Sequence, residues 1–263
     1  MRRRSSLETA VGPHARSVRA RLQASRSGRI GFAIREVPSD AAAVLDIGCG
    51  QGWVLGELPV AARRVGVDTD GTLIAVGRVE RPGCDLRVID GCELPFADAE
   101  FDVVLLGDVI EHVGAANKQL VIDEALRVLK DDGRFILTAP HAGLLAFLDP
   151  LDYKRRFPSV YRLFERRRGH APSTPHKVGH QHITLSEIMG YIGGRAEVTC
   201  VEYCGFAPMF DLLIGLTVAL RLFVPLSESI DRRLASGAAL ETSIPAPRFL
   251  ALHMRLVARR THR

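Results

Sequence analysis

Short apolar segments alternate with helical patterns through the middle of the chain. Five runs rich in Val, Ile and Leu predict strands, and the segments between them have helical spacing. This alternation is typical of a parallel sheet with crossover helices. It predicts an open α/β sheet over about residues 40–140. The predicted strands are Ala43 to Ile47, Arg64 to Val67, Leu86 to Ile89, Asp102 to Leu106 and Arg134 to Thr138.

Two helices carry recognisable boundaries. Apolar residues at core-facing spacing predict a helix from about Asn117 to Leu129, and Asp131-Asp132-Gly133 supplies the turn into the fifth strand. Further along, Thr184 and Glu187 have the spacing of a capping box, in which each side chain bonds the backbone of the other residue. They predict a helix that ends near Gly193-Gly194.

The pattern changes after His141. A basic and aromatic stretch runs from Leu144 to His170, and a nearly wholly apolar segment runs from Phe206 to Val224. Two alternating runs, Glu197 to Cys204 and Phe249 to Arg259, predict strands that close the sheet. We therefore expect a basic, helical N-terminal extension over 1–39 and one domain over 40–263, with helical inserts at 144–178 and 206–246.

Composition and charge narrow the class of protein. A chain of 263 residues with 47% hydrophobic and 25% charged residues is neither disordered, collagen-like nor a coiled coil. Its five cysteines include no C-x-x-C pair, so neither a disulfide framework nor a thiolate zinc site is indicated and a reducing cytoplasm fits. No apolar run of signal-peptide length follows the arginines at 2–4, so no cleaved leader is expected.

Charge is distributed unevenly. Residues 40–132 hold 18 acidic and 8 basic side chains, a net charge of −10, while the whole chain carries +5. The flanking segments together therefore carry +15, and we expect the acidic middle and the basic flanks to have different roles.

The sharpest local motif is Val44-Leu45-Asp46-Ile47-Gly48-Cys49-Gly50-Gln51-Gly52, in which a buried strand runs into alternating glycines. Glycine allows a tight turn and lets a ligand lie against bare backbone amides. A tight strand-to-helix turn without a ligand is the alternative interpretation. Three companions favour the ligand: Asp68 closes the second strand, Asp90 closes the third, and Gly107-Asp108 closes the fourth. All lie at the carboxyl ends of parallel strands, where open sheets bind ligands.

With these motifs, residues 40–141 resemble the class I S-adenosylmethionine-dependent methyltransferases, especially the branch of the ubiquinone and menaquinone biosynthesis methyltransferases. The resemblance implies a Rossmann-like seven-stranded sheet, mostly parallel with an antiparallel last strand, and helices on both faces. It also implies that Asp46 fixes the ammonium of S-adenosylmethionine, Asp68 the ribose and Asp90 the adenine. The cofactor-binding residues expected from it are Asp46, Gly48, Cys49, Gly50, Gly52, Asp68, Thr69, Asp90, Gly91, Cys92, Gly107 and Asp108.

A nicotinamide dinucleotide fold is the nearest rival interpretation. That fold requires a third glycine at position 53, where this chain has Trp53. A carboxylate at Asp46 would also repel a diphosphate. The sequence therefore favours the methyl donor.

Methyl transfer is an in-line displacement that mainly requires positioning and exclusion of water. A hydroxyl acceptor would also need a base, and His112 and His141, just past the fourth and fifth strands, are the candidates. Structural roles for both histidines remain open. The cluster His176, His180 and His182 is interpreted as part of a linker, and no metal is expected.

The acceptor is the least determined feature. The fourth strand lacks the Asn or Asp, prolines and aromatic residue typical of base N-methylation, so nucleic acid is disfavoured. Seven bases interleaved with aromatic residues over 152–170, and the apolar segment 206–224, favour an apolar or lipid-linked small-molecule acceptor. A solvated helix flanking the active site is the alternative interpretation of the basic stretch. We expect a cytoplasmic protein, with peripheral attachment to an anionic inner membrane surface left open. The uninterrupted apolar core Leu212 to Leu220 is short, which favours a buried or interfacial helix over a span.

Two other functions are not excluded by the sequence: a donor-binding module without turnover, and a methyltransferase acting on nucleic acid or protein. Whether oxygen, nitrogen or carbon is methylated, and the oligomeric state, are also open.

Overall fold

The structure is a computed structural model that describes residues 29–58, 63–144, 181–205 and 245–262 of the chain. The first half contains α3 (Arg29–Glu36), β1 (Ala43–Ile47), α4 (Trp53–Glu57), β2 (Arg63–Asp68), α5 (Gly71–Glu80), β3 (Asp85–Val88) and β4 (Phe101–Gly107). The second contains α6 (Ala115–Val128), β5 (Leu129–Pro140), α9 (Leu185–Ile192), β6 (Ala196–Cys204), the 3-10 turn η2 (Arg248–Leu250) and β7 (His253–Arg260).

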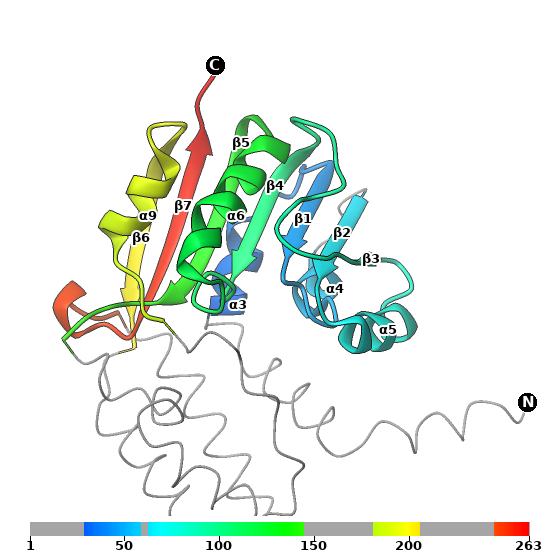
Figure 1. The fold of residues 1–263 in the computed structure, drawn as a ribbon, viewed down its shortest axis with the longest axis horizontal. Helices are drawn as coiled ribbons and strands as arrows, with labels where there is room; N and C mark the ends of the chain where they lie inside the picture. The colour runs from blue at the N-terminus through cyan, green and yellow to red at the C-terminus, as the bar shows by residue number, and fades with distance from the viewer. Residues whose placement is uncertain (1–28, 59–62, 145–180, 206–244, 263) are drawn as a thin grey trace, which may run out of the picture.

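The strands form one seven-stranded sheet in the order β3-β2-β1-β4-β5-β7-β6. Pairing is parallel from β3 through β5, and β7 runs antiparallel to both β5 and β6, as its opposite arrow shows in Figure 1. From β1 the chain adds β2 and β3 on one side of β1, and then β4 and β5 on its other side. The order of the strands therefore reverses between β1 and β4. Open sheets bind ligands at the carboxyl ends of strands at this kind of switch point.

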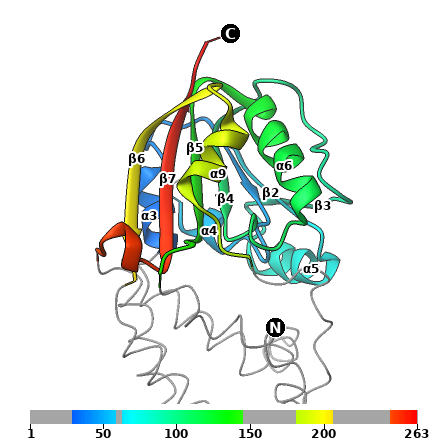
Figure 2. The ribbon, with the colours of Figure 1, turned by 60° about the vertical axis from the view of Figure 1, so that its left-hand side comes forward.

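Helices cover both faces of the sheet (Figures 1 and 2). Successive residues of β4 face opposite sides: Val104 packs in a core with α6 and α9, and Val103 packs in a second core with α3, α4 and α5. The continuous apolar runs in the sequence are therefore strands buried on both sides. The predicted fold class is confirmed.

The capping box at α9 is also confirmed. The Thr184 hydroxyl accepts from the Glu187 N–H at 3.2 Å, and the Glu187 carboxylate accepts from the Thr184 N–H at 2.8 Å. Gly193 ends the helix in the left-handed conformation, with φ 59°. Local sequence determines both ends of this helix.

The last predicted strand begins too early. The run predicted from Phe249 contains the 3-10 turn Arg248–Leu250, and β7 starts only at His253. Pro247 precedes the turn in extended backbone, and the alternation of apolar residues there does not distinguish a turn from a strand. In β5, the predicted turn at Asp131–Gly133 is an irregularity inside the strand, where Asp132 has φ 61°.

The segments outside the sheet are only partly described. Helix α3 falls within the predicted extension 1–39, and its Phe32 is fully buried in the second core. The basic stretch 145–170 and the apolar segment 206–224 lie outside the described residues. No helix in the described ranges is both long and apolar enough to cross a membrane.

Candidate functional site

The turn after β1 requires glycine. Gly48, Gly50 and Gly52 all have positive φ angles, of 73°, 54° and 74°. A Cβ on Gly48 would lie 2.2 Å from Cγ2 of Val109, which follows β4. A Cβ on Gly50 would meet only Leu73, at 3.9 Å, so the backbone at Gly50 is open to an approaching ligand.

A carboxylate at the end of β2 binds this turn directly. The Gly50 N–H donates to Oδ2 of Asp68 at 2.8 Å, and Oδ1 of Asp68 accepts from the Asp70 N–H at 2.9 Å. The N–H groups of Gly48 and Cys49 donate to the Val67 carbonyl at 2.8 and 3.0 Å. The ends of β1 and β2 therefore form one hydrogen-bonded unit, and Thr69 lies exposed beside it.

Asp46 is buried within β1, with 5% of its surface exposed. Burial, and then the negative charge of Asp68, raise the pKa of Asp46 to about 7. A carboxylate in this state gains from a cationic neighbour, because a positive charge would offset both causes of the shift. The ammonium of S-adenosylmethionine has the required charge.

The thiol of Cys49 is not a reactive group. It is buried, and its Sγ lies 3.7 Å from the Gly50 carbonyl. Burial, followed by the charges of Asp46 and Asp68, raises the pKa of Cys49, so the thiol stays neutral. Its contribution to the site is packing beneath the turn.

Arg81 supports the same turn and was not predicted from the sequence. Its guanidinium lies 3.6 Å from the centre of the Trp53 ring, and Nη1 donates to the Gln51 carbonyl at 3.0 Å. Arginine stacked on an aromatic face fixes both partners. No local pattern connects residues 30 positions apart, so only the fold reveals this support.

The segment after β3 is accessible. Asp90 and Gly91 are exposed, Gly91 has φ 86°, and a Cβ at Gly91 would meet nothing within 4 Å. Cys92 is half-buried and packs against the core. The Ile89 N–H donates to the Asp68 carbonyl at 3.0 Å, which ties the end of β3 to the end of β2.

The end of β4 is fixed to β5. Asp108 has φ 53°, its N–H donates to the Thr138 carbonyl at 2.9 Å, and its Oδ1 accepts from the Thr138 hydroxyl at 3.2 Å. Gly107 is exposed at the same edge. These residues lie on the other side of β1 from Asp68.

His141 is buried at the end of β5, with 3% exposure, and its ring packs edge-on against Tyr203 with centroids 5.0 Å apart. Burial lowers the pKa of His141, so its imidazole is neutral at pH 7. Within the described part of the chain, His141 Nδ1 and the Tyr203 hydroxyl are buried polar atoms without a hydrogen-bond partner. Such atoms favour a polar ligand nearby.

His112 has a different environment. Its side chain is 41% exposed, and Nε2 lies 4.0 Å from a carboxylate oxygen of the buried Glu111. Of the other predicted histidines, His176 and His180 lie outside the described residues. The structure thus joins the ends of β1, β2 and β3 by hydrogen bonds, while the two candidate bases lie beyond β4 and β5.

Comparisons with known proteins identify the proteins that this chain resembles. Residues 45–137 match a family model described as a methyltransferase domain. A "Probable S-adenosylmethionine-dependent methyltransferase" of Mycolicibacterium smegmatis is 37% identical over 99 residues, covering 37% of this chain and 38% of that protein. A sarcosine/dimethylglycine N-methyltransferase of Aphanothece halophytica is 37% identical over 108 residues, covering 37% of each chain.

A "Probable tRNA methyltransferase 9B" of Mus musculus is 34% identical over 95 residues, which are 36% of this chain and 21% of that protein. All of these matches span less than half of the relatives' own length. Each match also covers less than two fifths of this chain.

Solved structures match the fold along most of the chain. An S-adenosylmethionine-dependent methyltransferase from Thermotoga maritima has a TM-score of 0.58 and 17% identity, covering 97% of this chain and 98% of that one. The methyltransferase bound to the Trm112 activator of Haloferax volcanii also scores 0.58, at 16% identity, covering 95% and 96%.

The fold is that of the class I S-adenosylmethionine-dependent methyltransferases. The domain match and the names of the relatives support a methyltransferase enzyme with S-adenosylmethionine as its cofactor.

Proposed function

We propose that the protein transfers a methyl group from S-adenosylmethionine to a small-molecule acceptor. The observation that carries this proposal is the junction of Gly50 with Asp68 beside the buried Asp46. It combines open backbone for the amino-acid part, a carboxylate for the ribose hydroxyls and a second carboxylate for the ammonium. Asp90 and Gly91 then provide an accessible segment for the adenine.

When bound, S-adenosylmethionine would supply a methyl group carried on a sulfonium. The acceptor atom would attack the methyl carbon in line as the carbon–sulfur bond breaks, with S-adenosylhomocysteine as the leaving group. The chain's own residues orient the acceptor and exclude water. For a hydroxyl acceptor, His141 accepts the departing proton on its neutral imidazole, whose lowered pKa keeps it available at neutral pH. His112 is the alternative base, with Glu111 to stabilise its charged form.

We infer that the acceptor is apolar or lipid-linked, as in the branch of quinone biosynthesis methyltransferases. The support is the sequence of 152–170, basic and aromatic, and of the apolar 206–224. The relatives named for tRNA and for sarcosine match only 36% and 37% of this chain, so neither name carries an acceptor over to it.

Calorimetric titration tests the donor assignment. S-adenosylhomocysteine should bind at micromolar level, whereas NADH should not. Asp68→Ala should weaken binding by roughly 1.5 to 3 kcal/mol through loss of a charge-assisted hydrogen bond. Asp85→Ala, in the exposed Asp85–Arg87 pair at the start of β3, is the matched control and should bind normally. Tight NADH binding without S-adenosylhomocysteine binding would refute the donor assignment.

The acceptor is identified with labelled donor. The protein is incubated with methyl-labelled S-adenosylmethionine and fractionated cell extract, and label is followed into lipid, small-molecule, protein and nucleic-acid fractions. Label in the lipid or apolar small-molecule fraction supports the proposal. Label in RNA or protein would replace the acceptor class while leaving the donor site intact.

Membrane association is proposed from the same sequence features. Flotation with anionic vesicles should carry the protein at low salt and release it at high salt, at about 1 kcal/mol per basic residue near the surface. Reversal of Arg166, Arg167 and Arg168 to Glu should abolish flotation. Absence of binding at low salt would show that the basic stretch is an ordinary solvated surface.

A further inference from the structure

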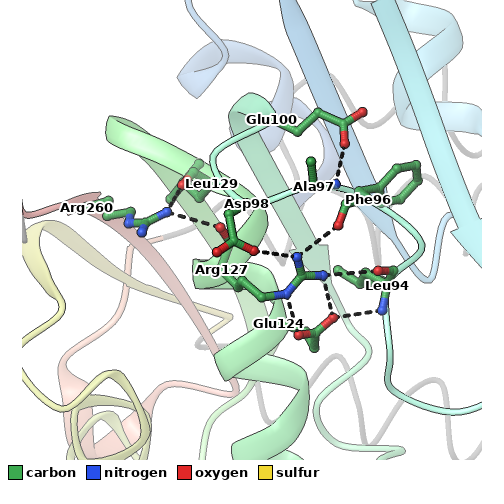
Figure 3. A network of polar contacts seen from close by, with 9 residues as sticks. All are labelled: Leu94, Phe96, Ala97, Asp98, Glu100, Glu124, Arg127, Leu129 and Arg260. Atoms are coloured by element: carbon green, nitrogen blue, oxygen red, sulfur yellow. Dashed lines mark hydrogen bonds and ion pairs between the residues drawn. The ribbon is translucent and has the colours of Figure 1, made fainter.

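The guanidinium of Arg127, near the end of α6, forms hydrogen bonds both within α6 and with a distant segment of the chain. It reaches the segment that connects β3 to β4, about 30 residues earlier in the chain (Figure 3). This segment starts at Asp90 and Gly91, the proposed adenine contacts, and it passes through Leu94 and Phe96.

Three contacts of Arg127 go to the connecting segment. Nη2 donates to the Leu94 carbonyl at 3.0 Å, and Nη1 donates to the Phe96 carbonyl at 2.8 Å. Nη1 also pairs with the carboxylate of Asp98 at 2.8 Å. The planar fork of one guanidinium thus spans three points of the segment, which a lysine ammonium cannot do.

Glu124, one turn earlier in α6, completes the clamp. Its Oε1 accepts from Arg127 Nε at 2.6 Å, while its Oε2 accepts from Arg127 Nη2 and from the Leu94 N–H, both at 2.8 Å. Both backbone polar groups of Leu94 are therefore held by side chains of α6. The hydrogen bonds from Arg127 lower the pKa of Glu124, which keeps it ionised.

The base of the clamp is itself fixed. Arg260 on β7 donates to the carbonyls of Arg127 and Leu129, which end α6 and begin β5 (Figure 3). The Ala99 N–H donates to the Arg127 carbonyl at 2.9 Å, so backbone contacts also hold the far end of the segment. Nearer to Asp90, the polar groups of Leu94 are held by the Arg127–Glu124 pair, while the Leu94 and Cys92 side chains pack in or against the core.

We propose that Arg127, braced by Glu124, is a positioning residue for donor binding: by holding both backbone groups of Leu94, it sets the segment Asp90–Cys92 in the conformation that receives the adenine. This inference rests on the proposed function. Arg127 bonds the segment at Leu94, two residues beyond Cys92, and is therefore assigned a positioning role and not a ligand contact. Its effect reaches the ligand only through the connecting segment.

Arg127→Ala should weaken binding of S-adenosylhomocysteine by about tenfold if the competent conformation falls to about one-tenth of molecules, because apparent affinity scales with that fraction. Arg127→Lys should not rescue binding, because a point charge cannot bridge the two carbonyls. Arg195→Ala is the matched control. Arg195 pairs with Asp123 of α6 at 2.6 Å, but its other hydrogen bonds go to the Tyr191 and Ile192 carbonyls at the end of α9. Its affinity should stay within about twofold of wild type.

A double-mutant cycle separates positioning from a general loss of stability. Arg127→Ala should have a smaller effect in an Asp90→Ala background, because both act through the same segment, and an additive effect in an Asp68→Ala background. Hydrogen exchange should increase at the Leu94 amide and at its neighbours toward the adenine segment Asp90–Cys92, and remain unchanged at Gly48 and Gly50. If Arg127→Ala does not fold, Glu124→Gln serves as the milder variant and should weaken binding in the same direction.

The outcomes are distinguishable. Wild-type protein that does not bind S-adenosylhomocysteine refutes the proposed function. Wild-type protein that binds, with Arg127→Ala or Arg127→Lys binding equally well, refutes the positioning role alone. A loss of exchange protection spread evenly over the sheet would also refute it, because the residue would then be merely structural.

Discussion

The Gly50 amide and the Asp68 carboxylate, 2.8 Å apart, join the turn after β1 to the end of β2. The same carboxylate also accepts from the Asp70 N–H, so it is oriented before any ligand arrives. In the proposed role of binding the ribose, a carboxylate held in this way would lose little conformational freedom on binding.

Asp68→Asn should therefore separate orientation from charge. The amide keeps one oxygen acceptor for a backbone N–H but loses the negative charge that favours hydroxyl donors. We expect S-adenosylhomocysteine affinity to fall by about 1 to 2 kcal/mol, less than for Asp68→Ala, because hydrogen bonds to charged groups are the stronger ones. Calorimetry on the three proteins checks this order, and equal losses for both variants would contradict it.

Gly48→Ala should destabilise the fold. The new Cβ would lie 2.2 Å from Val109 Cγ2, and alanine disfavours the φ of 73°. Together these effects should cost about 2 to 4 kcal/mol in the free energy of unfolding. Urea denaturation measures the change.

Gly190→Ala is the control for that substitution. Gly190 lies within α9, and a Cβ there would meet nothing within 4 Å. Alanine should stabilise the helix by about 0.5 to 1 kcal/mol. Adding Val109→Ala to Gly48→Ala should recover part of the loss by removing the clashing methyl. No recovery would mean that backbone strain alone is responsible.

Short sequence patterns predicted those elements whose ends are set by neighbouring residues in the sequence. The first strand, Ala43–Ile47, has the predicted bounds because its apolar run ends at glycines, and α9 starts at its capping box. The other strands differ from the prediction mainly at their ends. The start of β7 was missed because a 3-10 turn and a strand share the same short apolar pattern at Phe249.

The candidate site was predictable in its residue types but not in its contacts. Alternating glycines and strand-end aspartates indicated the donor, yet the clash that forbids a side chain at Gly48 comes from Val109, far along the chain. Arg81 on Trp53 and Arg127 on Leu94 likewise join distant segments. Such contacts depend on how the elements are arranged in space, which the apolar pattern along the chain does not determine.

His141→Gln should lower turnover by about 10² to 10⁴ if His141 is the general base, while leaving S-adenosylhomocysteine affinity unchanged. Because burial lowers the pKa of His141, the wild-type rate should persist to more acidic pH than an ordinary imidazole base would allow. Tyr203→Phe, which removes the hydroxyl beside the imidazole, should reduce turnover less. The assay uses the acceptor fraction that takes up label. Full activity of His141→Gln would leave His112 or positioning alone to account for catalysis.

Asp46 should make both the stability of the fold and donor affinity depend on pH. Its pKa of about 7 in the folded protein exceeds the ordinary 3.8, so the native state binds more protons than the unfolded state between these values. Stability therefore falls as pH rises from about 4 to 7, by at most about 4 kcal/mol. Asp46→Asn should remove this dependence and raise the melting temperature at pH 8.

Donor affinity should change in the opposite direction: the ammonium binds ionised Asp46, so wild-type affinity should increase about tenfold from pH 6 to pH 8, as the ionised fraction does. Asp46→Asn should bind weakly at both values. Thermal melts and titrations with S-adenosylhomocysteine at pH 6 and 8 test both trends, and an affinity independent of pH in the wild type would show that Asp46 does not hold the ammonium.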